Sequence, residues 1–179
     1  MSDLIVLTYD GKEKAGTVLQ AVATMKQENV QKALIGIEDA AVIVKKANGK
    51  VKVQQTLESV AKGSNVASGG FWGLLIGFLF GGPLLGTLFG MGLSALFGRN
   101  IDIGIDNEFI KTVGDDLAAE DSALFLLVAN TPVETVADVL KSFGGTLYHT
   151  SFSEETSQLF NDAMEHEPLK TAVLAHQNI

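Results

Sequence analysis

Apolar and polar positions follow two different periods in the first third of the chain. Residues 4–9 (LIVLTY) form an apolar, β-branched run with the length of one strand. In residues 12–29, apolar side chains at positions 15, 18, 19 and 22 recur with the spacing of one helix face, which predicts an amphipathic helix. Residues 41–47 and 50–54 again have the pattern of strands, and Asn48-Gly49 between them is a preferred pair for a type I′ turn. The predicted order is β-α-β-β.

A similar pattern follows residue 100. Residues 109–117 carry one apolar helix face, and Asp106 is placed to cap the first amides of that helix. The run SALFLLVAN at 122–130 predicts a buried strand. TPVE at 131–134 predicts a capping box that opens a second helix, which ends at Gly144-Gly145. Residues 146–152 (TLYHTSF) predict the last strand.

Each half of the chain therefore supplies a strand, a helix and a return strand. Two interleaved units of this kind predict an α+β fold, a ferredoxin-like split βαβ sandwich with an antiparallel sheet and helices on one face. The expected boundaries are residues 1–60 for the first half, 64–99 for an apolar insertion, 100–152 for the second half and 153–179 for a C-terminal helix and tail.

The insertion is uncharged and rich in glycine. From Val66 to Gly98, 33 residues carry no charge and ten are glycine. Ten glycines would oppose an exposed helix by about 10 kcal/mol, so a specific packing role is needed. Small residues recur at every fourth position in two ridges, which predicts a glycine zipper that lets helix backbones approach closely. The ridges are Gly69, Gly73, Gly77 and Gly81, and then Gly82, Gly86, Gly90, Ser94 and Gly98.

A membrane insertion of this segment has to be a hairpin. One helix of that length would run about 50 Å, against a hydrocarbon core of roughly 30 Å. Gly81, Gly82 and Pro83 at the midpoint predict the turn. A single span would also separate two half-sheets that need each other, whereas a hairpin returns the chain to the side it left. Lys62 and Arg99 at the rim predict that this side is cytoplasmic.

The composition and the motifs argue against several classes of function. The net charge of −8 argues against nucleic-acid binding, although residues 1–99 hold ten Lys and Arg against seven Asp and Glu. The chain has no cysteine, and His149, His166 and His176 include no pair spaced to chelate a metal from one helix face. GMGLSA at 90–95 matches the dinucleotide fingerprint but sits inside the apolar segment rather than after a strand. We expect no catalytic residue, metal or cofactor.

Four stretches carry a family resemblance: FWGLLIGFLFGGPLLG, GIDNEFIKTVGDDL, SALFLLV and FGGTLYHTSFSEE. With them the chain resembles, from Leu4 to about Met164, the bacterial family of predicted membrane proteins catalogued as domain of unknown function 1269. The resemblance implies a bacterial protein with a glycine-rich hairpin inserted into a soluble α/β domain. It implies no activity, ligand or catalytic residue.

The sequence thus predicts a non-enzymatic, self-associating structural or interaction protein, anchored in the bacterial inner membrane with its α/β domain in the cytoplasm. Its expected partners are itself and membrane lipid, because the hairpin would expose more apolar area than a soluble monomer tolerates. One alternative is a soluble cytoplasmic homo-oligomer that buries the hairpins between subunits. Another is a channel or transport component built from the hairpins, in which Thr87 and Ser94 lie on roughly one face.

Overall fold

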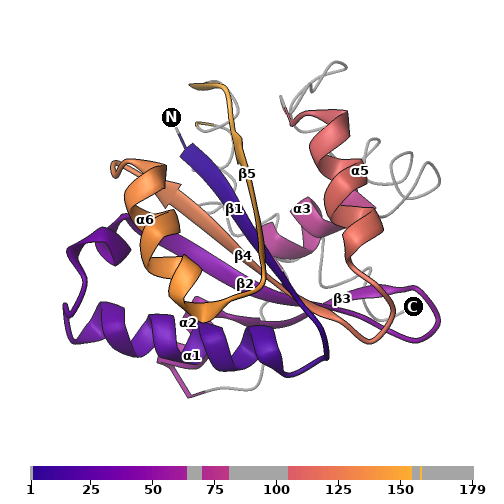
Figure 1. Ribbon diagram of the computed structural model, residues 1–179, viewed down its shortest axis with the longest axis horizontal. Coiled ribbons are helices and arrows are strands. Elements are labelled where there is room, and N and C mark those ends of the chain that lie inside the picture. Colours follow the sequence, from indigo (N-terminus) through magenta and orange to yellow (C-terminus); the bar gives the residue numbers. More distant parts are fainter. Residues whose placement is uncertain (1, 64–69, 81–104, 155–157, 159–179) are drawn as a thin grey trace.

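The computed structural model describes residues 2–63, 70–80, 105–154 and 158 (Figure 1). Its centre is a five-stranded sheet in the order β3-β2-β4-β1-β5, in which all neighbouring strands are antiparallel. The strands are β1 (Ser2–Tyr9), β2 (Ile37–Lys45), β3 (Val51–Thr56), β4 (Ser122–Ala129) and β5 (Thr146–Ser151). Each of the five strands predicted from the sequence is therefore present.

The chain on either side of the apolar segment shares this sheet. β4, which follows the segment, lies between β1 and β2, which precede it. β1 and β4 pair along their whole length, from Ser2 opposite Ala129 to Tyr9 opposite Ser122. All eight residues of β4 are buried. The two halves of the chain are thus joined at the most buried strand of the fold.

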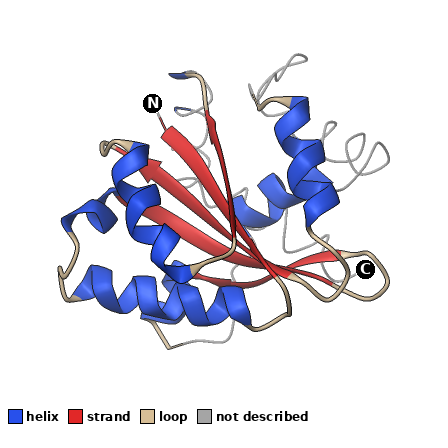
Figure 2. Cartoon of the chain, in the orientation of Figure 1, coloured by secondary structure: helices blue, strands red, loops and turns tan. Residues whose placement is uncertain are grey.

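Helices cover both faces of the sheet (Figure 2). On one face lie α1 (Lys14–Gln27) and α6 (Val133–Leu140), with the short α2 (Leu57–Ala61) at its border. On the other lie α3 (Gly70–Phe80) and α5 (Asn107–Asp116). Short 3₁₀ turns, η1 (Lys32–Gly36) and η2 (Lys141–Phe143), follow α1 and α6. The prediction of helices on one face was wrong, because α3 and α5 cover the second face.

Side chains alternate between the two faces of the sheet along each strand, so the strands contribute to two separate cores. In β1, Leu4 and Val6 point to the α3 and α5 side, whereas Ile5 and Leu7 point to the α1 and α6 side. Successive strand residues face opposite ways, so a strand buried on both faces is apolar throughout. The continuous apolar run of β4 fits this arrangement, in which both faces of the sheet are covered.

The turn between β2 and β3 differs from the prediction. The loop takes five residues, 46–50, and among its residues Gly49 alone has a positive φ, of 81°. Its N–H donates to the Lys46 carbonyl at 2.9 Å, and the Lys46 N–H donates to the Lys50 carbonyl at 2.8 Å. A type I′ turn needs two left-handed residues, so the longer loop, with one left-handed glycine, replaces it.

One of the two predicted helix caps is present. Asp106 accepts a hydrogen bond from the Glu108 amide at 2.9 Å and caps α5. The predicted capping box at 131–134 is wrong, since α6 starts at Val133 without a side-chain cap. The Thr131 side chain packs instead against Gly36, where no Cβ would fit. The predicted C-terminal helix and tail lie almost wholly outside the described residues.

Candidate functional site

The described part of the apolar segment is α3, eleven residues without a charge. Its side chains at i, i+3, i+4 and i+7 pack against the sheet and are buried, at 2% exposure for Trp72, 0% for Leu75, 4% for Ile76 and 7% for Leu79. From the sequence, this segment is expected to insert into a membrane or to lie between subunits. In the structure the partner of these four side chains is the sheet of the same chain.

Trp72 joins α3 to the sheet through an aromatic contact and a hydrogen bond. Its ring meets Phe125 of β4 edge-on, with centroids 6.5 Å apart and an interplanar angle of 73°. Phe80 approaches the same phenylalanine in the same manner at 6.2 Å. The indole Nε1–H donates to Oδ2 of Asp39 in β2 at 2.9 Å. A buried indole needs such an acceptor, so Asp39 completes the docking of α3.

Asp39 accepts this hydrogen bond at a partly buried position, where burial disfavours the charged form of its carboxyl. It follows a register shift between Ile37 and Asp39, and its Oδ1 accepts the Ala40 N–H at 2.8 Å. Burial raises the pKa of the carboxyl, and the hydrogen bonds from Ala40 and Trp72 only partly oppose this. The nearby Glu58 raises the pKa further, whereas Lys26 lowers it. A carboxylate held in this position therefore destabilises the fold relative to its neutral form.

Lys26 of α1 approaches Asp39 from the other side of β2. Its Nζ donates to the Ile37 carbonyl next to the register shift. Burial lowers the pKa of Lys26, and the negative charges of Asp39 and Glu38 raise it in part. The register shift thus gathers an indole, a carboxylate and an amine around one distortion of β2.

The predicted glycine-ridge and rim residues are only partly described. Gly73 and Gly77 lie in α3 and are half-buried. Lys62 follows α2 and pairs with Glu58 one turn earlier, both side chains being exposed. An exposed pair of this kind contributes about 0.5 kcal/mol or less. The predicted residues outside the described part are Gly69, Gly81, Gly82, Pro83, Gly86, Gly90, Ser94, Gly98 and Arg99.

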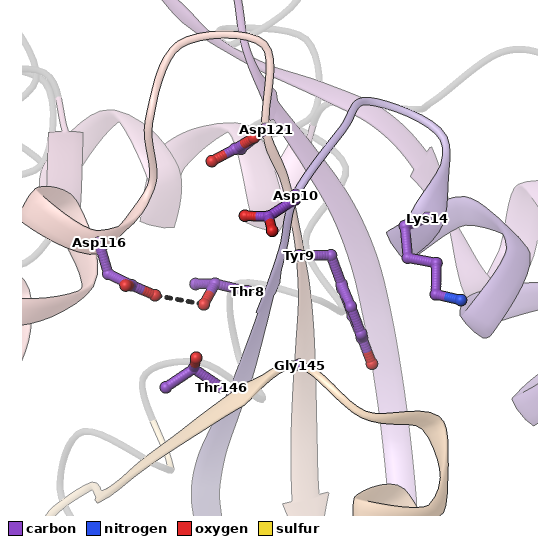
Figure 3. Close-up of a pocket in the computed structure, with 8 residues that line it drawn as sticks. All are labelled: Thr8, Tyr9, Asp10, Lys14, Asp116, Asp121, Gly145 and Thr146. Atoms are coloured by element: carbon purple, nitrogen blue, oxygen red, sulfur yellow. Dashed lines mark hydrogen bonds between the residues drawn. The ribbon is translucent and has the colours of Figure 1, made fainter.

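A polar pocket of about 320 Å³ opens where β1 ends (Figure 3). Its walls are Thr8, Tyr9, Asp10, Lys14, Asp116, Asp121, Gly145 and Thr146. In Figure 3, Asp116 reaches toward Thr8 from one side of β1, while Tyr9 and Lys14 lie on the other side. These residues come from four separate segments, so no pattern along the sequence indicated the pocket.

Two of the three carboxylates of this pocket, Asp116 and Asp121, have structural partners. Thr8 Oγ1 donates to Asp116, which ties β1 to the end of α5. Asp121 Oδ1 accepts the Gly11 N–H at 3.0 Å, which ties the loop after β1 to the start of β4. In the described part of the chain, no three or more of His, Cys, Asp and Glu are grouped so that they could hold a metal ion. The pocket is therefore best explained as a junction between loops.

Tyr9 gives the pocket no base. It is 6% exposed, and burial raises its pKa to about 12, so the phenol is neutral at physiological pH. Gly145, at a φ of 84°, lies directly over its ring. A Cβ at position 145 would stand 2.6 Å from Tyr9 Cε1 and 2.7 Å from the Thr8 carbonyl oxygen. The glycine is needed for this close approach as well as for its backbone angle.

An acid of β1 also meets a histidine and a serine of β5. Asp3 Oδ1 lies 3.0 Å from His149 Nε2, and Ser151 Oγ lies 3.4 Å from the same nitrogen. Ser151 Oγ also donates to Asp3 Oδ1 at 2.6 Å. A catalytic relay engages the two ring nitrogens separately, with the serine hydroxyl on one and the acid on the other. This cluster instead holds the edge of the sheet together.

Among the described residues, α3 and the other helices are each too short or too polar to cross a membrane. The comparison with curated proteins and the comparison with solved structures found no match to the chain. The family model described as protein of unknown function (DUF1269) matches residues 66–165, which include α3, α5, β4, α6 and β5. With more than half of its length matched, the chain belongs to the DUF1269 family of proteins of unknown function.

Proposed function

We propose that this is a non-enzymatic, self-associating interaction protein whose α/β domain is attached to one face of a membrane by the apolar segment at 64–99. The bacterial inner membrane is the proposed location, with the α/β domain on the cytoplasmic side. The proposal combines two properties of the chain. The insertion carries no charge, and the strands before and after it belong to one sheet.

The observation that carries the proposal is the pairing of β1 with β4. These strands lie on opposite sides of the apolar segment in the sequence and pair over eight residues. A hydrogen-bonded sheet cannot have its halves on two sides of a bilayer, because exposed backbone groups are not tolerated in the hydrocarbon region. A segment that enters lipid from this domain therefore has to leave on the same side.

Because α3 is docked on the sheet, only a shorter part of the apolar segment is left to insert into a bilayer. With residues 70–80 packed on the sheet, the uncharged stretch that follows α3 is the 18 residues 81–98. Fully helical, they would measure about 27 Å, less than the roughly 60 Å needed to cross a bilayer and return. We therefore propose a shallow, one-sided insertion, with the glycine positions from Gly82 to Gly98 packing against other copies. This is shorter than the two 16-residue arms expected from the sequence.

We also propose that the α/β part is a ferredoxin-like split βαβ sandwich. The units β1-α1-β2 and β4-α6-β5 interleave in the order β2-β4-β1-β5, and α1 and α6 lie on the same face. This is the arrangement of two split βαβ units. β3 would then be an additional edge strand beside β2, and α3 and α5 an additional cover for the second face.

A soluble homo-oligomer that buries the hairpins between subunits is the second candidate. The observation that favours it is that α3 already uses its apolar stripe against protein. For the channel alternative, the described residues offer no supporting contact.

The test is made on the full chain with two matched variants. Wild-type protein should float with anionic vesicles and stay with membranes after an alkaline carbonate wash. In detergent, replacing both Gly86 and Gly90 by Leu should lower the oligomeric mass, because the ridge is overpacked, whereas replacing both by Ala should preserve it. A large particle in the detergent-free soluble fraction would favour the second candidate. A monomer in every condition would refute self-association.

A further inference from the structure

The sheet has two edges, which are formed by β3 and β5. Along β5, the Phe152 N–H donates to the Ser2 carbonyl of β1 at 2.9 Å. Antiparallel strands alternate, so the backbone groups of residues 146, 148 and 150 also turn toward β1. Those of Leu147, His149 and Ser151 turn outward. Within the described part of the chain, no strand pairs with this outer row.

The two edges differ in the features that discourage pairing with another chain. β3 carries the exposed Lys52 and follows Lys50, and its register with β2 shifts between Val42 and Ile43. Lysines and register irregularities are the usual protection of an edge strand. β5 (TLYHTS) contains no Lys, Arg, Asp, Glu or Pro, and its register with β1 runs through six pairs without a shift. β5 is the unprotected edge.

β3 and β5 also differ in how well each could pair with its own copy across a two-fold axis. In a symmetric antiparallel pair, each residue meets the residue equally far from the axis, so a lysine near the centre meets its own copy. Directly opposed like charges destabilise a strand pair. Lys52, the second residue of β3, meets its own copy in a register centred on it, whereas no fixed charge lies on β5 in any register.

We propose that β5 pairs with β5 of a second copy of this chain, antiparallel and centred on His149, so that one sheet runs through both copies. This register uses all three outward residues: His149 faces its own copy, and Leu147 faces Ser151 of the second copy. Tyr148 and Thr150, both half-buried, then become neighbours across the axis. A two-fold axis perpendicular to the sheet keeps each face on its own side.

This pairing adds a second contact to the proposed self-association, and it does not rest on the glycine ridge. It places the α3 side of both copies in the same direction. Two apolar segments would then approach one surface together. The edge contact and the ridge contact are on different parts of the chain, so each can be lost while the other remains.

The chain has no cysteine, so single cysteines can test the register. Under mild oxidation of the full-length protein, His149→Cys should form a covalent dimer, because directly opposed strand residues lie within disulfide reach. Leu147→Cys and Ser151→Cys should each fail alone, since each lies about 13 Å from its own copy, but an equal mixture of the two should cross-link. Lys52→Cys on the other edge is the control and should stay uncross-linked.

A second pair of variants tests the contact without oxidation. His149→Asp places like charges on the axis, next to the carboxylate of Asp3, and should halve the mass of the edge dimer, whereas His149→Gln should leave it unchanged. Both are measured in the Gly86→Leu and Gly90→Leu background, where ridge contacts are removed, with circular dichroism as the folding control. The inference is overturned if His149→Asp keeps the dimer mass, or if His149→Cys stays monomeric. Vesicle binding is scored separately, so failure of the edge contact is distinguishable from failure of the membrane proposal.

Discussion

Trp72 and Asp39 are joined by a 2.9 Å hydrogen bond from the indole Nε1 to the carboxylate Oδ2. The bond connects the apolar segment to the register shift in β2 and brings a polar acceptor into an otherwise apolar core. This hydrogen bond fixes the position of α3 on the sheet more narrowly than apolar packing alone would. The domain and the start of the apolar segment are therefore one folded unit.

Removing the indole N–H should weaken this unit. Trp72→Phe keeps an aromatic ring but leaves Asp39 Oδ2 without its donor, so the free energy of unfolding in urea should fall by about 1–3 kcal/mol. A double-mutant cycle with Asp39→Asn isolates the interaction. If the two single effects add without coupling, the hydrogen bond contributes nothing to stability.

The charge of Asp39 should make stability depend on pH. Its pKa is higher in the folded protein than in the unfolded chain, so the folded protein binds the proton more tightly. Relative to Asp39→Asn, the wild type should gain stability as the pH falls from 7, and the gain should be complete below the ordinary carboxyl pKa of about 4. Urea titrations of both proteins at several pH values measure this. A difference that stays constant with pH would contradict the burial of a charged Asp39.

Trp72 is the one tryptophan in the chain, so its fluorescence reports on α3 alone. With its ring 2% exposed on the sheet, its emission should be blue-shifted and protected from acrylamide. If insertion begins after α3, as the docking indicates, vesicles with brominated acyl chains should leave this emission unquenched. Strong quenching would show that α3 leaves the sheet when the protein binds lipid.

Gly145 should tolerate alanine less than Gly49. Both have positive φ, 84° and 81°, so both variants carry a similar backbone strain of about 1–2 kcal/mol. Only at position 145 would the new Cβ meet other atoms, at 2.6 Å from Tyr9 and 2.7 Å from the Thr8 carbonyl. Gly145→Ala should therefore lower the free energy of unfolding by at least about 1 kcal/mol more than Gly49→Ala. Equal losses in urea would mean that β5 shifts freely away from Tyr9.

The five strands and the helices α1, α5 and α6 could be predicted because each has a strong local pattern, whereas α2 was not predicted. The alternation of apolar residues, the cap at Asp106 and the left-handed Gly144-Gly145 end of the second helical region are properties of short stretches. The errors came where a local signal competed with a distant contact. Thr131 looks like a helix cap, but it packs against Gly36, which is far away in the sequence.

The position of α3 needed the tertiary structure. A helix that is apolar on all sides has no preferred face in its sequence, so lipid, another copy and the sheet are equally good partners for it. One signal was available: β4 is apolar at every position after Ser122, which requires a cover on both faces of the sheet. The pocket at the end of β1 and the Asp3, His149 and Ser151 cluster gave no such signal, because their members lie far apart in the sequence.

The sequence by itself determined the five strands, the helices α1, α5 and α6, and the uncharged length between the two halves, because periodicity and charge are properties of neighbouring residues. Only the tertiary structure decided that Trp72 packs on Phe125 and binds Asp39, that helices cover both faces of the sheet, and that β3 and β5 form its two edges. The physical reason is that burial and edge pairing depend on which distant segments meet.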